Sequence, residues 1–231
     1  MFAPLTSPLR SSIRPAVIQN QTSSSSRIFQ ALLVVCCFVA PSCALIKSSS
    51  DLVEVKKIIP NVVLDIRYTT TNNFTGQKLY DNDRTFLRRA VAKHLRAAQK
   101  EFNGMNLGIK IYDAYRPLSV QRKMWAVFPQ EGYVANPAKG SRHNRGTAVD
   151  ITLVSLKDGK ELAMPSGYDE FSEKAHRNYM GAFAEEIRNR ELLERVMEKH
   201  GFKGLHTEWW HFDDVNSKKY ELLDIDSSQI K

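Results

Sequence analysis

The 231-residue chain has only three cysteines, all before residue 44, and no long apolar run. The shortage of cysteine excludes a disulfide-scaffolded fold for the rest of the chain. A membrane-spanning helix needs about 20 consecutive apolar residues, and no stretch approaches that length, which excludes an integral membrane protein. With 42% hydrophobic and 25% charged residues, the composition is that of a globular chain. The length suits one domain with its own core.

Acidic residues are also missing from the start of the chain, since none precedes Asp51. The same stretch carries three Arg and many Ser, followed by an apolar block at residues 31–40 and then by small residues. Together these features are typical of a secretory signal peptide. We therefore predict a leader at residues 1–44 that is removed on export. Residues 45–231 are then the mature domain, located in the periplasm or cell envelope.

Other interpretations of the leader stay open. An acid-free segment rich in Ser and Arg is also typical of an organelle transit peptide. Cys43 follows small residues as in a lipoprotein, although Pro41 argues against that. A disordered tail is the plainest alternative. A start codon assigned too far upstream would instead leave a cytoplasmic protein.

The net charge is +8, and removal of residues 1–44 lowers it to +5 because that segment has three Arg and no acid. Basic residues then cluster in one stretch among apolar residues at helical spacing: Arg84, Arg88, Arg89, Lys93, Arg96 and Lys100. The stretch predicts an amphipathic helix with a solvated basic face, ended by Gly104. A nucleic-acid surface is the alternative, but stacking aromatics and a binding motif are both missing, so we predict no nucleic-acid partner. Attraction to an anionic polymer, such as a bacterial cell wall, fits equally well.

Hydrophobic periodicity predicts the remaining elements. Strands are expected at residues 107–112, 147–153 and 208–212, helices at 117–128 and from about 183 to 200, and extended segments within 51–68. On the first of these strands, Ile109 and Ile111 alternate with other residues, which predicts one buried face. There is no internal repeat and no regular β-α-β order. We therefore predict a compact single α+β domain, with helices packed around a small, mainly antiparallel central sheet.

Two fragments place histidines beside carboxylates in strand-like surroundings. In the first, His143 lies in a Gly-containing turn, and Asp150 lies inside the strand that follows. A carboxylate there is costly unless it is paired or binds a metal. In the second, Glu208 and His211 flank two tryptophans. Two imidazoles and one carboxylate form a catalytic zinc set with an open fourth position, and a further carboxylate can take a proton from water.

Each fragment alone is weak evidence, because a structural histidine is commoner than a metal ligand. Glu-x-x-His also occurs in di-iron helical bundles, but those need helices and a second copy of the motif, which this chain lacks. The spacing poses a geometric difficulty as well, since residues three apart in a flat strand point to opposite faces. Glu208 and His211 can therefore face one metal only if Glu208 begins the strand or lies at a bulge.

A third fragment ends the strand at residues 107–112 with Arg116, which can hold a developing oxyanion or form a surface ion pair with Asp113. With all three fragments, the chain resembles the zinc-dependent D-alanyl-D-alanine dipeptidases of peptidase family M15, known from vancomycin resistance. The resemblance covers roughly residues 50–215, in the family's order. Its motifs are Asp65-Ile-Arg-Tyr68, Asn73-Phe-Thr-Gly76, Tyr112-Asp-Ala-Tyr-Arg-Pro117, Ser141-Arg-His-x2-Gly-x-Ala-x-Asp150, Tyr168-Asp-Glu-Phe-Ser-Glu-Lys-Ala-His176 and Glu208-Trp-Trp-His211.

The resemblance implies a zinc metallopeptidase that hydrolyses the dipeptide D-alanyl-D-alanine to two D-alanines with metal-activated water. One zinc ion per chain is expected, with His143, Asp150 and His211 as its ligands. The family's compact α+β domain, with the metal on a central antiparallel sheet, agrees with the fold predicted from periodicity.

The resemblance also implies roles for five further residues. Glu208 occupies the position of the family's general base and acid, and Arg116 that of the arginine that stabilises the tetrahedral intermediate. Ser141, Tyr68 and Asp169 match motif positions near the substrate pocket.

Two alternatives to a dipeptidase stay open. A D,D-carboxypeptidase acting on peptidoglycan stem peptides would differ by an open pocket, which sequence does not show. A non-catalytic zinc module that binds cell wall is disfavoured, because base, ligands and arginine are all present. His206 departs from the family pattern and is interpreted as a bystander, with a third-histidine ligand role as its alternative. Trp209 and Trp210 are interpreted as core and pocket wall.

Overall fold

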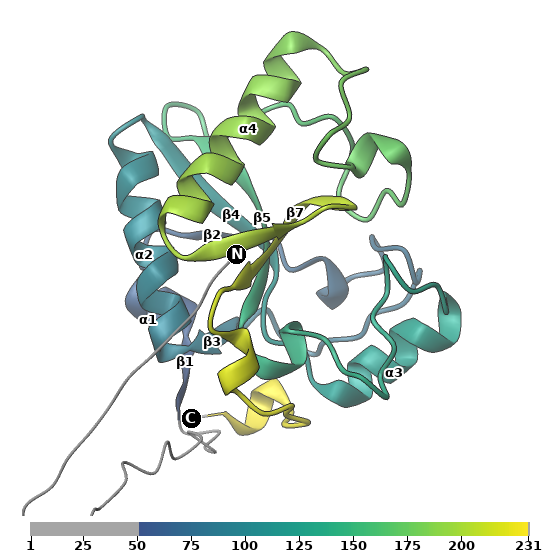
Figure 1. Ribbon diagram of the computed structural model, residues 1–231. Coiled ribbons are helices and arrows are strands. Elements are labelled where there is room, and N and C mark those ends of the chain that lie inside the picture. Colours follow the sequence, from purple (N-terminus) through teal and green to yellow (C-terminus); the bar gives the residue numbers. More distant parts are fainter. Residues whose placement is uncertain (1–50, 231) are drawn as a thin grey trace, which may run out of the picture. The chain divides into compact units, whose positions relative to one another are not determined.

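The computed structural model describes residues 51–230, in which short strands and helices follow one another irregularly. The strands are β1 (Leu52–Glu54), β2 (Val63–Leu64), β3 (Phe86–Arg88), β4 (Leu107–Asp113), β5 (Ala148–Ser155), β6 (Phe202–Leu205) and β7 (Glu208–Asp214). The helices are α1 (Val55–Ile58), α2 (Arg89–Asn103), α3 (Leu118–Val127) and α4 (Ala184–Lys199). The order of these elements confirms the predicted α+β class (Figure 1).

Five strands form the central sheet in the order β2-β4-β5-β7-β6, and only the β2–β4 pair is parallel. The prediction of a small, mainly antiparallel sheet is therefore confirmed. A second sheet pairs β1 with β3, and the short helix α1 lies next to it in the chain. Periodicity predicted only extended segments there, because a four-residue helix is too short to show a helical period.

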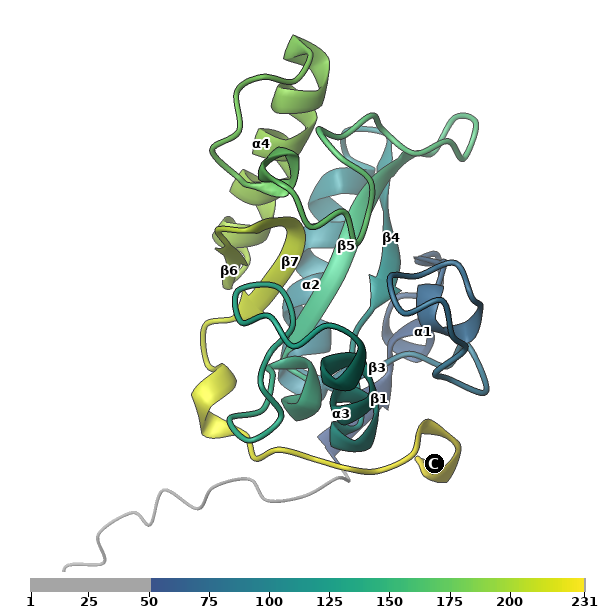
Figure 2. The ribbon, with the colours of Figure 1, turned by 90° about the vertical axis from the view of Figure 1, so that its right-hand side faces the viewer.

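Helices α2 and α4 cover one face of the central sheet. Strand alternation turns Val149, Ile151 and Leu153 of β5 toward that face, and all three belong to the main apolar core. The same core contains Leu95 of α2 and Leu193 of α4. Figure 2 shows β4 and β5 in front of α2, with α3 and long loops on the viewer's side. The polar residues of β5 therefore face the loop-covered side of the sheet.

The basic helix is confirmed, but its start differs from the prediction. Leu87 and Arg88 lie in β3, because this segment pairs with β1 in an extended conformation. Arg88 is fully buried, and its Nε donates a hydrogen bond to the carbonyl oxygen of Arg145. The prediction that this arginine belongs to a solvated face is therefore wrong. Four exposed basic residues remain on α2, namely Arg89, Lys93, Arg96 and Lys100.

Strand β4 differs from its predicted pattern of one buried face. Tyr112 is only 2% exposed, because its ring stacks on the ring of Tyr168 with 4.5 Å between their centroids. A loop that follows β5 therefore covers the second face of the strand.

Helix α4 ends as predicted, since Gly201 adopts a left-handed φ of 86° directly after the last turn.

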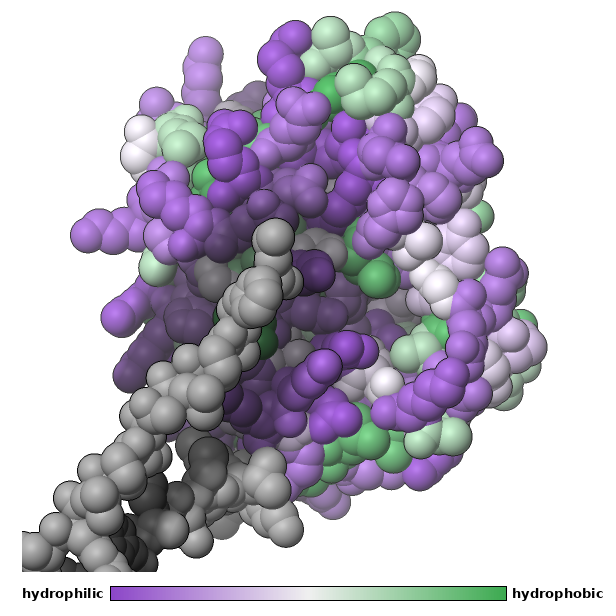
Figure 3. Space-filling view, viewed as in Figure 1, coloured by the Kyte–Doolittle hydropathy of each residue, from purple (hydrophilic) through white to green (hydrophobic). Residues whose placement is uncertain are grey.

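The described residues contain no helix that is both long and apolar enough to cross a membrane. Figure 3 shows one face of the domain as mainly hydrophilic, with apolar residues in small groups. The predicted leader and its cleavage near residue 44 lie outside the described residues.

Candidate active site

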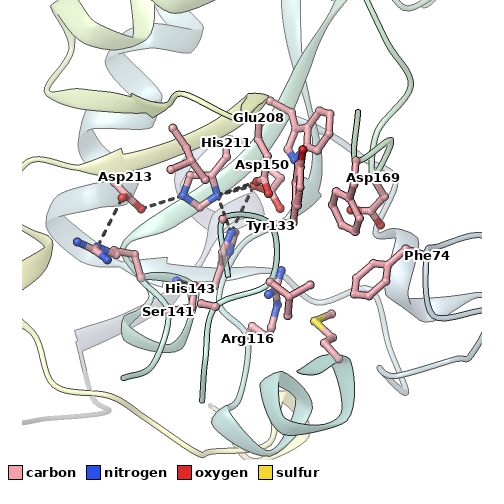
Figure 4. A pocket seen from close by; sticks show the side chains of 18 of the residues that line it. Phe74, Arg116, Tyr133, Ser141, His143, Asp150, Asp169, Glu208, His211 and Asp213 are labelled. Atoms are coloured by element: carbon pink, nitrogen blue, oxygen red, sulfur yellow. Dashed lines mark hydrogen bonds and ion pairs between the residues drawn. The ribbon is translucent and has the colours of Figure 1, made fainter. Parts of the chain in front are cut away.

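A cavity of about 190 Å³ lies where β5 and β7 meet the loop-covered side of the sheet. One wall is aromatic and includes Phe74, Tyr133, Phe171 and Trp210, while polar residues of the three predicted fragments form the other wall (Figure 4). Drug-sized ligands occupy pockets of about 300–1,000 Å³, so this smaller volume suits a molecule of dipeptide size.

Three predicted ligands meet in this cavity. His143 lies in a short 3₁₀ turn before β5, while Asp150 and His211 are direct partners across the β5–β7 ladder. The Nε2 atom of His143 lies 3.2 Å from Nδ1 of His211 and 3.3 Å from Oδ1 of Asp150. The third distance, from Nδ1 of His211 to Oδ1 of Asp150, is 3.0 Å. Sheet register thus brings together residues that are 61 and 68 positions apart in the chain.

This donor set fits a small divalent cation. Nitrogen and oxygen ligands at about 2.0–2.1 Å from a tetrahedral zinc ion lie about 3.3–3.4 Å from one another. The three distances of 3.0–3.3 Å are close to that spacing. Two imidazoles and a carboxylate, all buried, form the candidate metal group. A catalytic zinc site has this composition and keeps one position open.

The outward-facing atoms of the three residues have partners that orient them. Nδ1 of His143 donates to the carbonyl oxygen of Ala114 over 2.6 Å, and Nε2 of His211 donates to Asp213 over 2.9 Å. The hydroxyl of Tyr168 donates to the second oxygen of Asp150 over 3.1 Å. Metal-binding histidines are typically oriented in this way.

The pKa shifts of His211 and Asp150 indicate a site that is stabilised by added positive charge. Burial favours the neutral ring of His211, but Asp213 and Asp150 together raise its pKa well above the ordinary value. Burial likewise opposes ionisation of Asp150, yet His143 and His211 hold its pKa far below the usual range. Facing acceptors repel one another unless a proton or a cation lies between them.

Glu208 reaches the same cavity through an irregularity of β7. It is the first residue of the strand, and the β6–β7 register shifts between the pairs Gly204–Phe212 and Leu205–Glu208. Its Oε2 therefore lies 3.9 Å from Nδ1 of His211, although the two residues are three apart. This arrangement meets the condition stated from the sequence, that Glu208 begins the strand or lies at a bulge.

Burial raises the pKa of Glu208 to about 8, and Asp150 and Asp169 act in the same direction. His211 and Arg116 partly oppose this rise. A cation held by the neighbouring ligands would also favour the carboxylate. A carboxyl group that titrates near neutral pH is suited to proton transfer.

Arg116 is held rigidly at the cavity wall. Its Nε and Nη2 donate to Oδ2 of Asp113 over 2.9 and 2.6 Å, and its Nη1 donates to Gln121 over 2.8 Å. The ion pair with Asp113 considered from the sequence therefore exists, but it is buried rather than on the surface. Three of the five guanidinium N–H groups are used, which leaves two for a substrate oxygen. Tyr80 donates to the other oxygen of Asp113 over 2.9 Å.

The three residues predicted near the substrate all line the cavity. The hydroxyl of Tyr68 donates to both oxygens of Asp169, at 3.2 and 3.1 Å. Burial raises the pKa of Asp169 to about 7, and Asp150 adds to this rise. Ser141 accepts a hydrogen bond from the backbone N–H of His143 over 3.2 Å, which stabilises the turn that carries this candidate ligand.

The other histidines lie outside the metal group found among residues 51–230. His206 is exposed, and its ring lies 5.5 Å from that of His176. His94 pairs with Asp214 over 2.7 Å, and His200 with Glu101 over 2.7 Å.

Sequence reasoning missed the residues that hold the site in place. Asp213 was detectable, because it lies two positions after His211 and strand alternation puts both side chains on one face. Gln121 and Tyr80 carry no local signal, since each acts on a partner from another element.

Comparison with known proteins identifies the family. The model of the D-Ala-D-Ala dipeptidase family, peptidase M15, matches residues 48–226. The chain belongs to this family. A D-alanyl-D-alanine dipeptidase of Escherichia coli is 36% identical over 76% of this chain and 90% of its own length. Proteins of the same name from Enterococcus faecalis and Streptomyces coelicolor are 32% and 28% identical, covering 68% and 71% of this chain and 87% and 91% of theirs.

Among solved structures, a vancomycin resistance D,D-dipeptidase in complex with a D-Ala-D-Ala phosphinate analogue is similar at 20% identity. The match covers 60% of this chain and 55% of that chain, with a TM-score of 0.37. Because this score is low, the M15 assignment depends on the sequence matches. The chain is thus a hydrolase of a metallopeptidase family.

Proposed function

We propose that this M15 peptidase hydrolyses the free dipeptide D-alanyl-D-alanine to two D-alanines. The observation that carries the proposal is the meeting of a three-ligand group, Glu208 and Arg116 in one cavity of dipeptide size. Relatives at 36% and 32% identity carry the name of this activity.

The proposed cofactor is one zinc ion per chain, held by His143, Asp150 and His211. The imidazole and carboxylate donors, their separations of 3.0–3.3 Å and their outward hydrogen bonds support this choice. When bound, the ion supplies Lewis acidity and lowers the pKa of water at its open position.

The residues of the chain then supply proton transfer and charge stabilisation. Glu208 accepts a proton from the attacking water and gives it to the leaving amine. Arg116, fixed by Asp113, holds the negative charge that develops on the carbonyl oxygen of the scissile bond. Asp169, with Tyr68, faces the substrate ammonium, which favours the ionised form of that carboxylate. Ser141 lies on the wall of the same cavity and offers its hydroxyl.

A loop beside the cavity favours a dipeptide over a stem peptide as the substrate. Residues 132–135 line the cavity, and the hydroxyl of Thr207 donates to the carbonyl oxygen of Gly132 over 2.7 Å. Gln121 holds the same loop through a 2.8 Å bond from its Nε2 to the carbonyl oxygen of Ala135. The loop is thus fastened both to the turn before β7 and to α3, and we expect it to limit the length of the substrate.

A direct assay tests this function. With zinc added, kcat/KM for D-Ala-D-Ala should exceed that for a stem pentapeptide at least about tenfold, or about 1.4 kcal/mol. Thr207→Val should narrow this ratio by loosening the loop, whereas Thr71→Val, an exposed control, should leave it unchanged. Faster cleavage of the pentapeptide would support a D,D-carboxypeptidase. Failure of the zinc-loaded protein to cleave either peptide would support a non-catalytic module.

Substitution of Arg116 tests the oxyanion role. Arg116→Ala should lower kcat by about 10²–10³-fold, because one charged donor to the transition state is lost. Metal content should stay unchanged, since a guanidinium does not bind zinc. Arg122→Ala on α3, which removes an exposed ion pair with Asp224, is the matched control and should leave kcat unchanged. An equal loss in both variants would contradict the assignment.

We also propose that residues 45–231 are the catalytic domain and residues 1–44 a leader. The acid-free composition and apolar block of the first segment support this division, as does the family match, which begins at residue 48.

A further inference from the structure

The irregularity of β7 leaves a gap in the ladder beside the site. Between the pairs Gly204–Phe212 and Leu205–Glu208, β6 advances by one residue, while the partner on β7 moves back by four. Three residues of β7, ending with His211, therefore have no Cα partner on β6 in this register. Buried carbonyl groups at such a gap need other donors, because an unpaired one costs about 1–3 kcal/mol.

The side chain of Arg177 supplies such a donor for His211, the last residue of the gap. Nη2 of Arg177 donates to the carbonyl oxygen of His211 over 2.7 Å, and its Nε donates to that of Leu205 over 2.9 Å. Its backbone N–H donates to the carbonyl oxygen of His206 over 3.0 Å. A single residue thus binds the last residue of β6, the turn that follows and the metal-ligand position of β7.

Packing, an aromatic ring and an acidic neighbour keep the guanidinium of Arg177 in place. Its side chain is 7% exposed, and its Cζ lies 4.3 Å from the ring centroid of Phe212. Glu194 of α4 lies 3.5 Å from Nη1. A Cβ at Gly204 would clash with Cζ and Nε of Arg177, so a larger residue there would displace the guanidinium from this position. Burial lowers the pKa of Arg177 to about 10, which still leaves the group charged at neutral pH.

We propose that Arg177 is a positioning residue for the reaction. It stabilises the irregular part of β7 that allows the side chains of Glu208 and His211 to point into one cavity. In a regular strand, residues three apart point to opposite faces, so a base at 208 and a ligand at 211 require the irregular register. Arg177 acts through the backbone of these residues and does not line the cavity. The part of this inference that concerns catalysis depends on the proposed function, whereas the part that concerns metal binding does not.

The test measures zinc affinity and steady-state kinetics of Arg177→Ala. Removing an oriented outer contact typically costs about 10–100-fold in metal affinity, and a misplacement of about 1 Å costs about 10²-fold in rate. We therefore expect kcat to fall about 10²-fold and zinc affinity at least about tenfold, with KM changed less than kcat. Arg195→Ala, which removes an exposed arginine of α4, is the matched control and should leave both quantities unchanged.

Chemical rescue separates positioning from a general loss of stability. Millimolar guanidinium should restore much of the kcat of Arg177→Ala, because the ion fills the vacated space and donates to the same carbonyls. Methylammonium, which has the charge without the planar donors, should not restore it. Arg177→Lys should likewise stay impaired, although it folds and keeps the charge.

Three results would overturn the proposal. The first is a folded Arg177→Ala whose kcat and zinc affinity both match the wild type, and the second is an impaired variant that guanidinium does not rescue. The third is loss of the fold in both the Ala and the Lys variants, which would make Arg177 a residue of general stability. Wild-type protein that fails to cleave D-Ala-D-Ala would refute the proposed function alone, because the zinc affinities still test the role of Arg177.

Discussion

Glu208→Ala should keep its zinc and lose about 10²–10⁴-fold in kcat, or about 2.7–5.5 kcal/mol of transition-state stabilisation. The reason is that Glu208 lies next to the metal group without belonging to it. Its Oε2 is 3.9 Å from Nδ1 of His211, compared with the 3.0 Å that separates Asp150 from the same nitrogen. Metal analysis of the purified variant, together with steady-state kinetics on D-Ala-D-Ala, checks both parts of the expectation.

The loss should appear in kcat more than in KM, because proton transfer develops in the transition state. Glu198→Ala removes an exposed carboxylate of α4 and should change neither quantity. If Glu208→Ala purified without zinc, Glu208 would have to be a ligand. Near-normal turnover of the variant would instead refute the peptidase mechanism.

His143→Ala and His211→Ala should lose zinc and activity together. Each substitution removes one of three buried candidate ligands and leaves Asp150 with a single imidazole neighbour. The loss of activity should be nearly complete, because the proposed zinc ion would supply the Lewis acid on which hydrolysis depends. Metal content measured beside turnover in each variant checks this expectation.

Two controls sharpen the assignment. His206→Ala should keep both zinc and activity, because this exposed residue lies outside the metal group of the described chain. Removal of zinc from the wild type by a chelator should abolish turnover, and added zinc should restore it. Full zinc content in a His143→Ala/His211→Ala double variant would show that the metal binds elsewhere. Loss of zinc from His206→Ala would support the third-histidine alternative.

The sequence determined features that depend on neighbours in the chain. Apolar spacing predicts α2, α3, α4, β4, β5 and β7, because each period is read within one element. Asp150 was identifiable as a candidate ligand because a carboxylate inside an apolar strand is costly by itself. Asp213, which the sequence analysis missed, was detectable from strand alternation in the same way. The leader at residues 1–44 is also a local pattern, and it stays a prediction.

Only the tertiary structure decided which residues meet. The β5–β7 register puts Asp150 opposite His211, and pairing with β1 makes Arg88 a buried strand residue instead of part of a basic helix. The loop at residues 132–135 lines the cavity through bonds to Thr207 and Gln121, which come from distant elements. Contacts of this kind depend on how separate segments pack, so a periodic pattern within one segment does not predict them.

Glu208 and His211 show most clearly which features the sequence determined and which the tertiary structure decided. Their spacing of three made a shared site conditional on an irregular strand, and the sequence does not show whether that irregularity exists. The structure supplies it through the β6–β7 register shift and the guanidinium of Arg177. This residue lies 28 and 34 positions before Leu205 and His211, whose carbonyl oxygens it binds. Every residue has a backbone carbonyl, so the sequence does not show which carbonyls a side chain will bind. A donor such as Arg177 is therefore recognised only from the tertiary structure.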